Sequence, residues 1–403
     1  MRPSVDHARA AWRVLQTVIS PSPLIHSQVL SRDVGAQIFL KLESLQETGS
    51  FKVRGAYYRL ACLNEHERRV GVVAASAGNH AQGVAWAASK LGIDATIVMP
   101  EDVSLRKLMA VKEYGPEIVL HGTFYDDAFA RATKISEETG KILVSAFNDP
   151  YVIAGQGTIG LELEHELEDD TVVVVPVGGG GLISGISLAA KALNPNIRIV
   201  GVQAENCPSA IRSLEESRPT FTEASPTLAD GIAVKKPGEL TFPIIRELVD
   251  EMVSVGEEAI AGAILTLIDR ASLVAEGAGA VPLAALMENK LHTRARRYIL
   301  ILSGGNIETN TIDRILQRGA IRMGRLIRIE VNLPDVPGAL WNLLGIVADE
   351  KANILHIVHD RLALQNPIQV SRVELNLETR GPEHAQEVVD RMLRSGYRVQ
   401  RIL

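Results

Sequence analysis

A lysine in the segment that covers residues 49–55 has the surroundings of a reactive amine. Lys52 follows Phe51 and precedes Arg54, with glycines at positions 49 and 55. A lysine amine condenses with an aldehyde only when it is uncharged, so it needs desolvation or a neighbouring cation to lower its pKa from about 10.4. Phe51 and Arg54 could supply both. A single lysine is more often a solvated residue in a first helical turn, so the chemistry depends on further motifs.

A second motif, residues 76–80, lies between an apolar run at 70–75 and small or apolar residues at 81–88. We expect a strand-to-helix turn there. Such a turn leaves main-chain N–H groups open at a helix N-terminus, where a substrate carboxylate is favoured. The alternative is that Ser76 caps the helix and Asn79 only adopts a turn conformation. The candidate substrate-binding residues are Ser76, Ala77, Gly78, Asn79 and His80.

A third motif contains four consecutive glycines after an apolar strand at 171–177. A strand, a glycine loop and a helix form a cradle whose main-chain N–H groups bind phosphate. The spacing does not fit the dinucleotide fingerprint, and no Walker lysine follows, so a small monophosphate is favoured. The candidate phosphate-binding residues are Gly178, Gly179, Gly180, Gly181 and Leu182.

An amine, an anion site and a phosphate cradle together predict a pyridoxal 5'-phosphate enzyme. A fourth motif, residues 303–306, follows an apolar strand at 298–302 and begins with Ser303. Ser303 could be the N-cap of a following helix.

With these four motifs in order, the chain resembles the threonine ammonia-lyase (threonine dehydratase) family of fold-type II pyridoxal phosphate enzymes, relatives of the tryptophan synthase β-subunit. The resemblance covers nearly the whole chain. It implies that Lys52 holds the cofactor through a Schiff base, that Phe51 packs against its ring, and that Asn79 binds the ring hydroxyl. It also implies that residues 178–182 bind the phosphate and that Ser303 faces the pyridine nitrogen.

The resemblance also implies a reaction, in which Lys52 becomes the general base that removes the Cα proton of an amino acid. Loss of the β-hydroxyl would then convert L-threonine, or L-serine, into a 2-oxo acid and ammonia. Serine racemases that resemble this chain carry a serine at the position of Ala77, and a methyl group cannot transfer a proton. Three interpretations stay open: an ammonia-lyase, a serine racemase or β-replacement synthase of the same fold, and a non-catalytic amino-acid sensor.

Two further positions are candidates for a place beside the cofactor ring. Glu276 stands among small apolar residues before an apolar helix, so it is either part of the site or a first-turn charge favoured by the helix dipole. Gly231 belongs to an Ala-Asp-Gly segment that resembles a ring-adjacent segment of the family, although Asp-Gly is also a common turn. His80 could pack under its helix as easily as contact substrate.

Composition favours a cytoplasmic enzyme with a large core. The chain has 403 residues, 46% of them hydrophobic, and a net charge of −6, which argues against a nucleic-acid partner. Cys62 and Cys207 are isolated, so we expect neither a disulfide framework nor a metal site. The longest apolar runs are far shorter than about 20 residues, so we expect no membrane span. We expect a homodimer or homotetramer.

Apolar strand-like runs alternate with helical patterns over residues 1–318, which predicts an α/β fold with parallel sheets. In such sheets ligands bind beyond the carboxyl ends of the strands, where the motifs fall. By the resemblance, this catalytic region is a tryptophan synthase β-subunit-like core in which a small subdomain, about residues 53–147, is inserted into a larger one.

After a basic linker at 319–325, residues 326–403 have the order strand, helix, strand, strand, helix, strand, which predicts a ferredoxin-like βαββαβ unit. This unit resembles an ACT domain, a small-molecule sensor. The resemblance implies an amino-acid effector near the turn that contains Asp335, Pro337 and Gly338. The alternative is that the unit only joins subunits. Isoleucine-controlled biosynthetic relatives often carry two such units, so the expected role in isoleucine biosynthesis is open.

Overall fold

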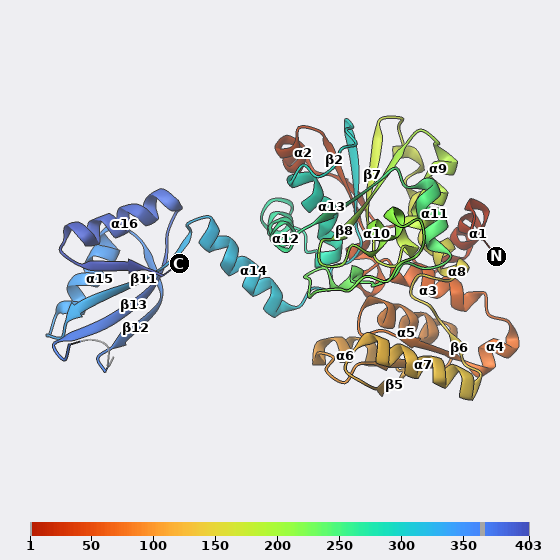
Figure 1. Ribbon diagram of the computed structural model, residues 1–403, viewed down its shortest axis with the longest axis horizontal. Coiled ribbons are helices and arrows are strands. Elements are labelled where there is room, and N and C mark those ends of the chain that lie inside the picture. Colours follow the sequence, from red (N-terminus) through yellow and green to blue (C-terminus); the bar gives the residue numbers. More distant parts are fainter. Residues whose placement is uncertain (1, 363–366, 403) are drawn as a thin grey trace. The chain divides into compact units, whose positions relative to one another are not determined.

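The computed structural model describes residues 2–362 and 367–402. The chain divides into two compact units, Met1–Ile307 and Glu308–Leu403, and each is described by itself (Figure 1). Helix α14 (Thr309–Arg322) begins the second unit, so the predicted linker at 319–325 is the end of this helix and the turn that follows. The predicted boundary after residue 318 therefore falls inside a helix.

The larger sheet of the first unit has six strands in the order β1-β2-β10-β7-β8-β9. All neighbouring strands pair in parallel except β1, which is antiparallel to β2. β10 lies between β2 and β7, so the strand before Ser303 and the strand before the glycine loop are neighbours. The strands are β1 (Leu24–His26), β2 (Gln37–Leu42), β7 (Thr171–Pro176), β8 (Arg198–Ala204), β9 (Glu251–Val255) and β10 (Arg297–Leu302).

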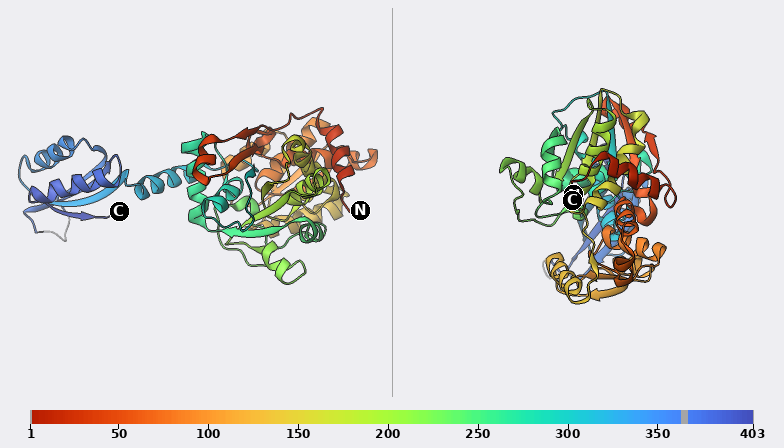
Figure 2. Two further views of the ribbon diagram at one scale, coloured as in Figure 1. Left: turned by 90° about the horizontal axis from the view of Figure 1, so that it is seen from above. Right: turned by 90° about the vertical axis from the view of Figure 1, so that its right-hand side faces the viewer.

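The smaller sheet of the first unit is entirely parallel and has the order β5-β4-β3-β6. The apolar run at 142–147 predicts a strand of that length, but β6 contains only two residues. One further main-chain hydrogen bond, from Val144 to the Val73 carbonyl, follows it. In the right-hand view of Figure 2 this subdomain, coloured orange to yellow, lies below the larger sheet. The strands are β3 (Val72–Ala75), β4 (Ala95–Met99), β5 (Glu117–Leu120) and β6 (Ile142–Leu143).

The central strands form because they are short apolar runs, and every residue of β3, β4 and β7 is buried, as expected for parallel strands covered on both faces.

The helices α8 and α9 pack closely at a glycine. A Cβ at Gly185 in α9 would lie 2.5 Å from the Gly157 nitrogen in α8. The helices of this unit are α1 (Val5–Leu15), α2 (Gln28–Val34), α3 (Lys52–Ala61), α4 (Glu65–Val70), α5 (Asn79–Leu91), α6 (Leu105–Lys112), α7 (Tyr125–Thr139), α8 (Pro150–Glu162), α9 (Gly181–Leu193), α10 (Ser209–Glu215), α11 (Thr241–Leu248), α12 (Glu257–Ala271) and α13 (Gly277–Met287). Its short 3-10 helices are η1 (Glu43–Leu45), η2 (Glu47–Gly49), η3 (Glu164–Glu166) and η4 (Asp230–Ile232).

The second unit has an antiparallel sheet in the order β12-β13-β11-β14. In β11 and β13, buried residues alternate with more exposed ones, so the two strands place an apolar face on the helices and a polar face toward water. This is the predicted ferredoxin-like order of an ACT-like domain. Its elements are β11 (Leu326–Pro334), α15 (Ala339–Asp349), β12 (Asn353–Asp360), β13 (Val370–Glu378), α16 (Pro382–Arg394) and β14 (Arg398–Arg401).

Candidate active site

Lys52 is the first residue of α3, and its amine lies inside the first unit. The Nζ atom donates a hydrogen bond to the Ala146 carbonyl at 3.3 Å and lies 5.0 Å from the centroid of the Phe51 ring. Burial lowers the pKa of Lys52 to about 8, and the negative charge of Glu276 opposes that shift. The Lys52 side chain is half-buried, and its pKa is shifted in the direction that a reactive lysine needs.

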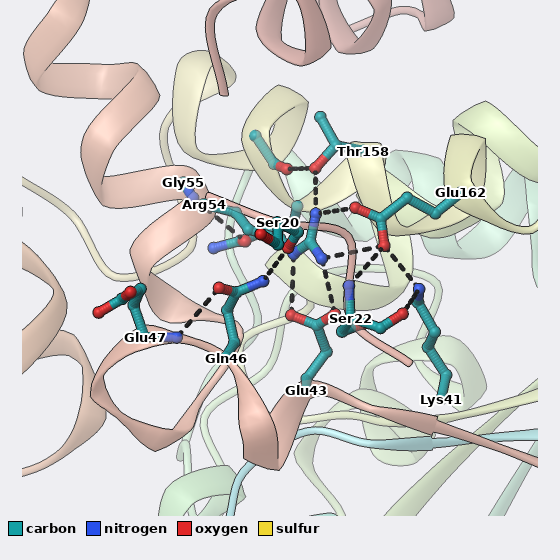
Figure 3. Close-up of polar contacts among 12 residues, drawn as sticks. Ser20, Ser22, Lys41, Glu43, Gln46, Glu47, Arg54, Gly55, Thr158 and Glu162 are labelled. Atoms are coloured by element: carbon teal, nitrogen blue, oxygen red, sulfur yellow. Dashed lines mark hydrogen bonds and ion pairs between the residues drawn. The ribbon is translucent and has the colours of Figure 1, made fainter. Parts of the chain in front are cut away.

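Arg54 does not supply the cation that the sequence suggested for Lys52. Its side chain is fully buried and paired with two carboxylates, since Nε donates to Glu43 at 2.8 Å and Nη1 donates to Glu162 at 2.6 Å (Figure 3). Lys41 donates to the same Glu162 at 2.5 Å. These four groups neutralise one another, so desolvation alone lowers the pKa of Lys52. Their role is to hold α3 against η1, β2 and α8.

The segment at 76–80 forms the turn between β3 and α5 that the sequence predicted. Gly78 donates its main-chain N–H to the Ser76 hydroxyl at 3.1 Å, and α5 then begins at Asn79 without a side-chain cap. Ser76 therefore shapes the turn, and the interpretation of Ser76 as the helix cap is wrong. Within the described residues, the N–H groups of Asn79, His80 and Ala81 donate no hydrogen bond. This helix N-terminus can accept an anion.

His80 belongs to the packing under α5. Its Nε2 atom lies 2.9 Å from the Val144 carbonyl, and the ring is buried. Burial, followed by the positive charge of Lys52, lowers the pKa of His80 to about 3, so the ring is neutral near pH 7 and Nε2 donates its proton to the carbonyl. Of the two alternatives for His80, the structure favours packing. Ala77 is half-buried in the same turn and packs against the apolar core around α3 and α5.

The glycine loop lies between β7 and α9 in a space that side chains would fill. A Cβ at Gly179 would lie 2.4 Å from the Phe147 ring, and a Cβ at Gly181 would lie 2.9 Å from the Phe147 backbone. Gly180 has φ 94°, a left-handed conformation that favours glycine. Thr241 fixes the loop from the other side, since its hydroxyl donates to the Gly179 carbonyl at 2.6 Å.

The main-chain N–H groups of this loop are open. None of the N–H groups of Gly178, Gly179, Gly180, Gly181 or Leu182 donates a hydrogen bond to another residue in the part of the chain that the structure describes. Open donors at the N-terminus of a helix fit a phosphate group, so the residues present here fit the phosphate of the predicted cofactor.

Ser303 follows β10 and lies beside the Lys52 segment. Its carbonyl accepts a hydrogen bond from the Phe51 N–H at 3.1 Å, and Ser50 forms an isolated bridge with Gly304. The next helix begins at Thr309, with Glu308 as its N-cap, so the interpretation of Ser303 as a helix cap is wrong. Ser303 is 2% exposed, and its position beside Lys52 fits a role toward the cofactor ring.

Glu276 and Asn79 meet across the site. The Asn79 amide nitrogen donates to both carboxylate oxygens of Glu276, at 2.8 and 3.0 Å. Gly231 is close, since a Cβ there would lie 3.6 Å from the Glu276 Oε1 atom. The structure therefore brings together three positions that the sequence listed separately. It also shows that the Asn79 amide, which we expected to serve only a ring hydroxyl, already has a carboxylate partner.

Sequence reasoning missed three residues that shape this site. Asn306 donates to the Asn79 side-chain oxygen at 2.8 Å and to the Thr48 carbonyl at 2.7 Å, which orients Asn79. Asn306 closes the fourth motif and could have been found there. Phe147 and Thr241 stand in segments with no motif, and nothing in the sequence marks them.

In the second unit, the turn predicted for the effector is present. Asp335 forms a bidentate ion pair with Arg361, at 2.8 and 2.9 Å, which lowers the pKa of the Asp335 carboxyl. Gly338 has φ 88° and is the N-cap of α15, so a side chain there would be strained. Pro337 lies in the same turn.

Metal clusters and membrane-spanning helices are both absent from the described residues. No group of three or more His, Cys, Asp or Glu side chains among them could hold a metal ion. None of the helices formed by these residues is long and apolar enough to cross a membrane.

The fold and the site define the class of protein. Residues 15–304 match the family model "Pyridoxal-phosphate dependent enzyme", and the chain belongs to that family. Among solved structures, the chain resembles a maize serine racemase, with 34% identity and a TM-score of 0.74; the match covers 80% of this chain and 99% of that chain. It also resembles a T.th. threonine deaminase, with 42% identity and a TM-score of 0.71; this match covers 76% of this chain and 99% of that chain.

Comparison with curated relatives identifies a more specific family within the pyridoxal-phosphate dependent enzymes. The L-threonine ammonia-lyase of Thermotoga maritima is 51% identical over 397 residues, which cover 98% of this chain and 99% of the relative. The catabolic L-threonine dehydratase TdcB of Escherichia coli K12 is 46% identical over 314 residues, 77% of this chain and 95% of the relative. The chain belongs to the L-threonine ammonia-lyase family of fold-type II pyridoxal phosphate enzymes.

Proposed function

We propose that this chain removes ammonia from L-threonine, and from L-serine, at the site between β3, β7 and β10, with Lys52 as the reactive amine. The observation that carries the proposal is the half-buried Lys52 Nζ atom, which lies at the Ala146 carbonyl. The next residue, Phe147, packs on the open glycine loop before α9, and Gly83 of α5 packs on the Lys52 backbone. Pyridoxal phosphate would be held by Lys52, Asn79, Ser303 and the loop at 178–182. When bound, this cofactor withdraws electrons from the substrate Cα, so that the Cα proton becomes removable.

The chain's own residues supply binding and proton transfer. The N–H groups at the start of α5 bind the substrate carboxylate and so fix the direction in which Cα points. Lys52 has a pKa lowered to about 8, so roughly a tenth of the amine is neutral at pH 7, far more than for an ordinary lysine. Its neutral Nζ atom removes the Cα proton. Loss of the β-hydroxyl and hydrolysis then give 2-oxobutanoate from threonine, or pyruvate from serine, together with ammonia.

The side chain at position 77 favours elimination over racemisation. Racemisation needs a proton donor on the second face of Cα, and the methyl group of Ala77 cannot be one. The similarity to a maize serine racemase concerns the fold and does not supply this donor. The expected outcome is ammonia release from L-threonine without an added thiol, which would also separate the chain from a β-replacement synthase.

The test of the active site is Lys52→Ala. We expect the visible absorption band of the bound cofactor to disappear and ammonia release to fall by at least about 10³-fold, because both covalent attachment and the base are lost. Wild-type activity in Lys52→Ala would overturn the assignment. A wild-type protein without a visible band after incubation with the cofactor would favour the non-catalytic sensor.

We also propose that the second unit is an ACT regulatory domain that binds an amino acid at the turn formed by Asp335, Pro337 and Gly338. The support is the positive φ of Gly338, which frees main-chain groups at the start of α15, beside the charged Asp335 side chain. Initial rates with and without isoleucine and valine test this. Equal rates, together with no binding of either amino acid by calorimetry, would leave the alternative that the unit joins subunits.

Oligomeric state, location and pathway are also proposals. We propose a homodimer or homotetramer, cytoplasmic location and a role in isoleucine biosynthesis, on the basis of the family resemblance. Light scattering on the purified full chain measures the oligomeric state. The role in isoleucine biosynthesis is tested by producing the chain in a cell that lacks its own threonine deaminating enzyme and measuring growth with and without added isoleucine.

A further inference from the structure

The Gly179 carbonyl accepts two hydrogen bonds from outside the glycine loop. The Thr241 hydroxyl donates to it at 2.6 Å, and the Gly238 main-chain N–H donates to it at 3.2 Å. The same hydroxyl lies 3.2 Å from the Gly238 carbonyl, but it has one proton, and the shorter contact is the better hydrogen bond. Thr241 is fully buried, so water does not compete for its hydroxyl. Two donors use both lone pairs of this carbonyl oxygen.

The peptide that joins Gly179 to Gly180 could otherwise turn over. Glycine has no Cβ and adopts positive and negative φ about equally well, so a peptide between two glycines meets little steric resistance to reversal. A planar trans peptide points its C=O and its N–H in opposite directions, and the described residues contain no cis peptide. The two donors on the Gly179 carbonyl therefore also fix the Gly180 N–H, which points away from Thr241 and Gly238.

The Gly180 N–H is one of the open donors of the loop. It donates no hydrogen bond to any residue that the structure describes, and Gly180 is the N-cap of α9. An N–H group at this helix N-terminus attracts an anion, whereas a reversed peptide would present the negative end of a carbonyl and repel it. The orientation of this one peptide thus decides whether the loop attracts or repels a phosphate group at that point.

The start of α11 packs directly on the glycine loop. A Cβ at Gly180 would lie 2.8 Å from the Thr241 hydroxyl oxygen and 2.7 Å from the Ile245 Cδ1 atom. The Thr241 carbonyl also accepts a hydrogen bond from the Ser184 hydroxyl at 3.4 Å, which joins α11 to α9. The Thr241 hydroxyl therefore has little freedom to leave the Gly179 carbonyl.

The turn before α11 is fixed by Asn148. The Asn148 Oδ1 atom accepts a hydrogen bond from the Leu240 N–H at 2.9 Å, and a Cβ at Gly238 would lie 2.5 Å from the same oxygen. Asn148 stands two residues after Ala146, whose carbonyl accepts the hydrogen bond from the Lys52 amine. The turn that presents both donors to the glycine loop is thus held by the same stretch of chain that contacts the amine.

We infer that Thr241 is a positioning residue of the phosphate site, because its hydroxyl holds the Gly179 carbonyl and so aims the Gly180 N–H at the cofactor phosphate. The hydroxyl acts through the peptide between the two glycines. The methyl group of Thr241 fills space and has no part in this role. The inference rests on the proposed function in taking the loop at 178–182 as the phosphate site.

The experiment compares two vitamers that differ in the phosphate group. Pyridoxal 5'-phosphate and pyridoxal are titrated separately into the full chain after removal of the cofactor, and the ratio of the two affinities reports the contribution of the phosphate. Thr241→Val keeps the shape of the side chain and removes the donor. We expect it to lose about tenfold in affinity for pyridoxal 5'-phosphate and to keep its affinity for pyridoxal within about twofold. Thr241→Ser keeps the hydroxyl and should restore the wild-type ratio to within about threefold.

Two results for the valine variant would overturn the inference. One is an unchanged ratio, and the other is an equal loss for both vitamers, which a general packing defect would give. Thr241→Ala supplies the same comparison should the valine variant fail to fold. Ser184→Ala, which removes a buried hydroxyl from the same contact between α9 and α11, is the matched control and should keep the wild-type ratio. A wild-type chain that binds both vitamers equally well would instead contradict the phosphate site itself.

Discussion

The Arg54 guanidinium and the Glu43 carboxylate form two hydrogen bonds of 2.8 Å each, and neither side chain is exposed to water. Arg54 also donates to Glu162 and to the Thr158 hydroxyl, so all of its contacts are charge-assisted and buried or nearly so. Since Arg54 stands two residues after Lys52 in α3, this pairing fixes the end of the helix that carries the reactive amine. The amine is held in place by an ion network that it does not join.

Arg54→Met is therefore expected to destabilise the protein strongly, because two carboxylates would stay buried without their common partner. Removal of one member of a buried charge network costs about 3–5 kcal/mol. Chemical denaturation followed by intrinsic fluorescence measures the change. As a control, Arg270→Met removes an exposed pair with Asp33 and should cost less than about 1 kcal/mol. Similar losses in the two variants would contradict the proposed anchoring role.

Gly179→Ala should weaken cofactor binding, because its Cβ would lie 2.4 Å from the Phe147 ring. Overpacking of this kind costs about 1–3 kcal/mol, which corresponds to a loss of roughly 5- to 150-fold in affinity if the strain falls on the binding-competent loop. Fluorescence titration with pyridoxal phosphate measures the loss of affinity. Gly262→Ala in α12 meets no atom within 4 Å and should bind as the wild type does. An unchanged affinity for the Gly179 variant would count against the loop as the phosphate site.

Acid should destabilise the protein through His80. The pKa of His80 is about 3 in the folded chain and about 6.5 when unfolded, so the unfolded state binds more protons between these values. Neutral His80 makes its full contribution to the free energy of unfolding above about pH 6.5, and this contribution is lost as the pH falls toward 3. Between these values the free energy of unfolding changes by up to about 1.4 kcal/mol per pH unit. Unfolding free energies of the wild type and His80→Gln at several pH values test this. The variant should show a shallower slope, and parallel slopes would refute the expectation.

Ala77→Ser should give the chain a weak racemase activity, since it places a hydroxyl group at the turn where the second face of Cα is expected. The prediction is that D-serine forms from L-serine at least about tenfold faster than in the wild type, as measured by chiral chromatography, while ammonia release continues. Ala77→Gly, which changes the turn without adding a proton donor, is the control. Equal D-serine formation in both variants would show that the hydroxyl group is not the cause.

Local motifs made much of this site predictable from the sequence. Ser303 and the four glycines follow β10 and β7, which are neighbours in the larger sheet, so strand order brings them to one edge of that sheet. Asn79 follows β3 of the smaller sheet, and Lys52 begins α3. The segment 326–403 was also recognisable, because the burial of β11 and β13 alternates as their sequences do.

The other features of the site could not be predicted from the sequence, because they depend on contacts between segments that are far apart in the chain. Arg54 looked like a cation beside Lys52, but its charge is neutralised by Glu43 and Glu162, and Glu162 stands 108 residues away in the chain. Glu276 and Asn79 are 197 residues apart, so no periodicity could pair them. Phe147 was expected to end a strand, yet β6 stops at Leu143 because the chain turns there toward the glycine loop.

The early end of β6 frees the residues at 144–149 to pass from the small subdomain to α8, and this short stretch touches both halves of the site. Ala146 contacts the Lys52 amine, Phe147 supports the glycine loop, and Asn148 accepts a hydrogen bond from Leu240 at 2.9 Å. A single inserted residue here would shift the support of the amine relative to that of the loop. Unlike a surface turn, this crossing has little tolerance for a change in length, and directed evolution of the enzyme would do best to leave its register intact.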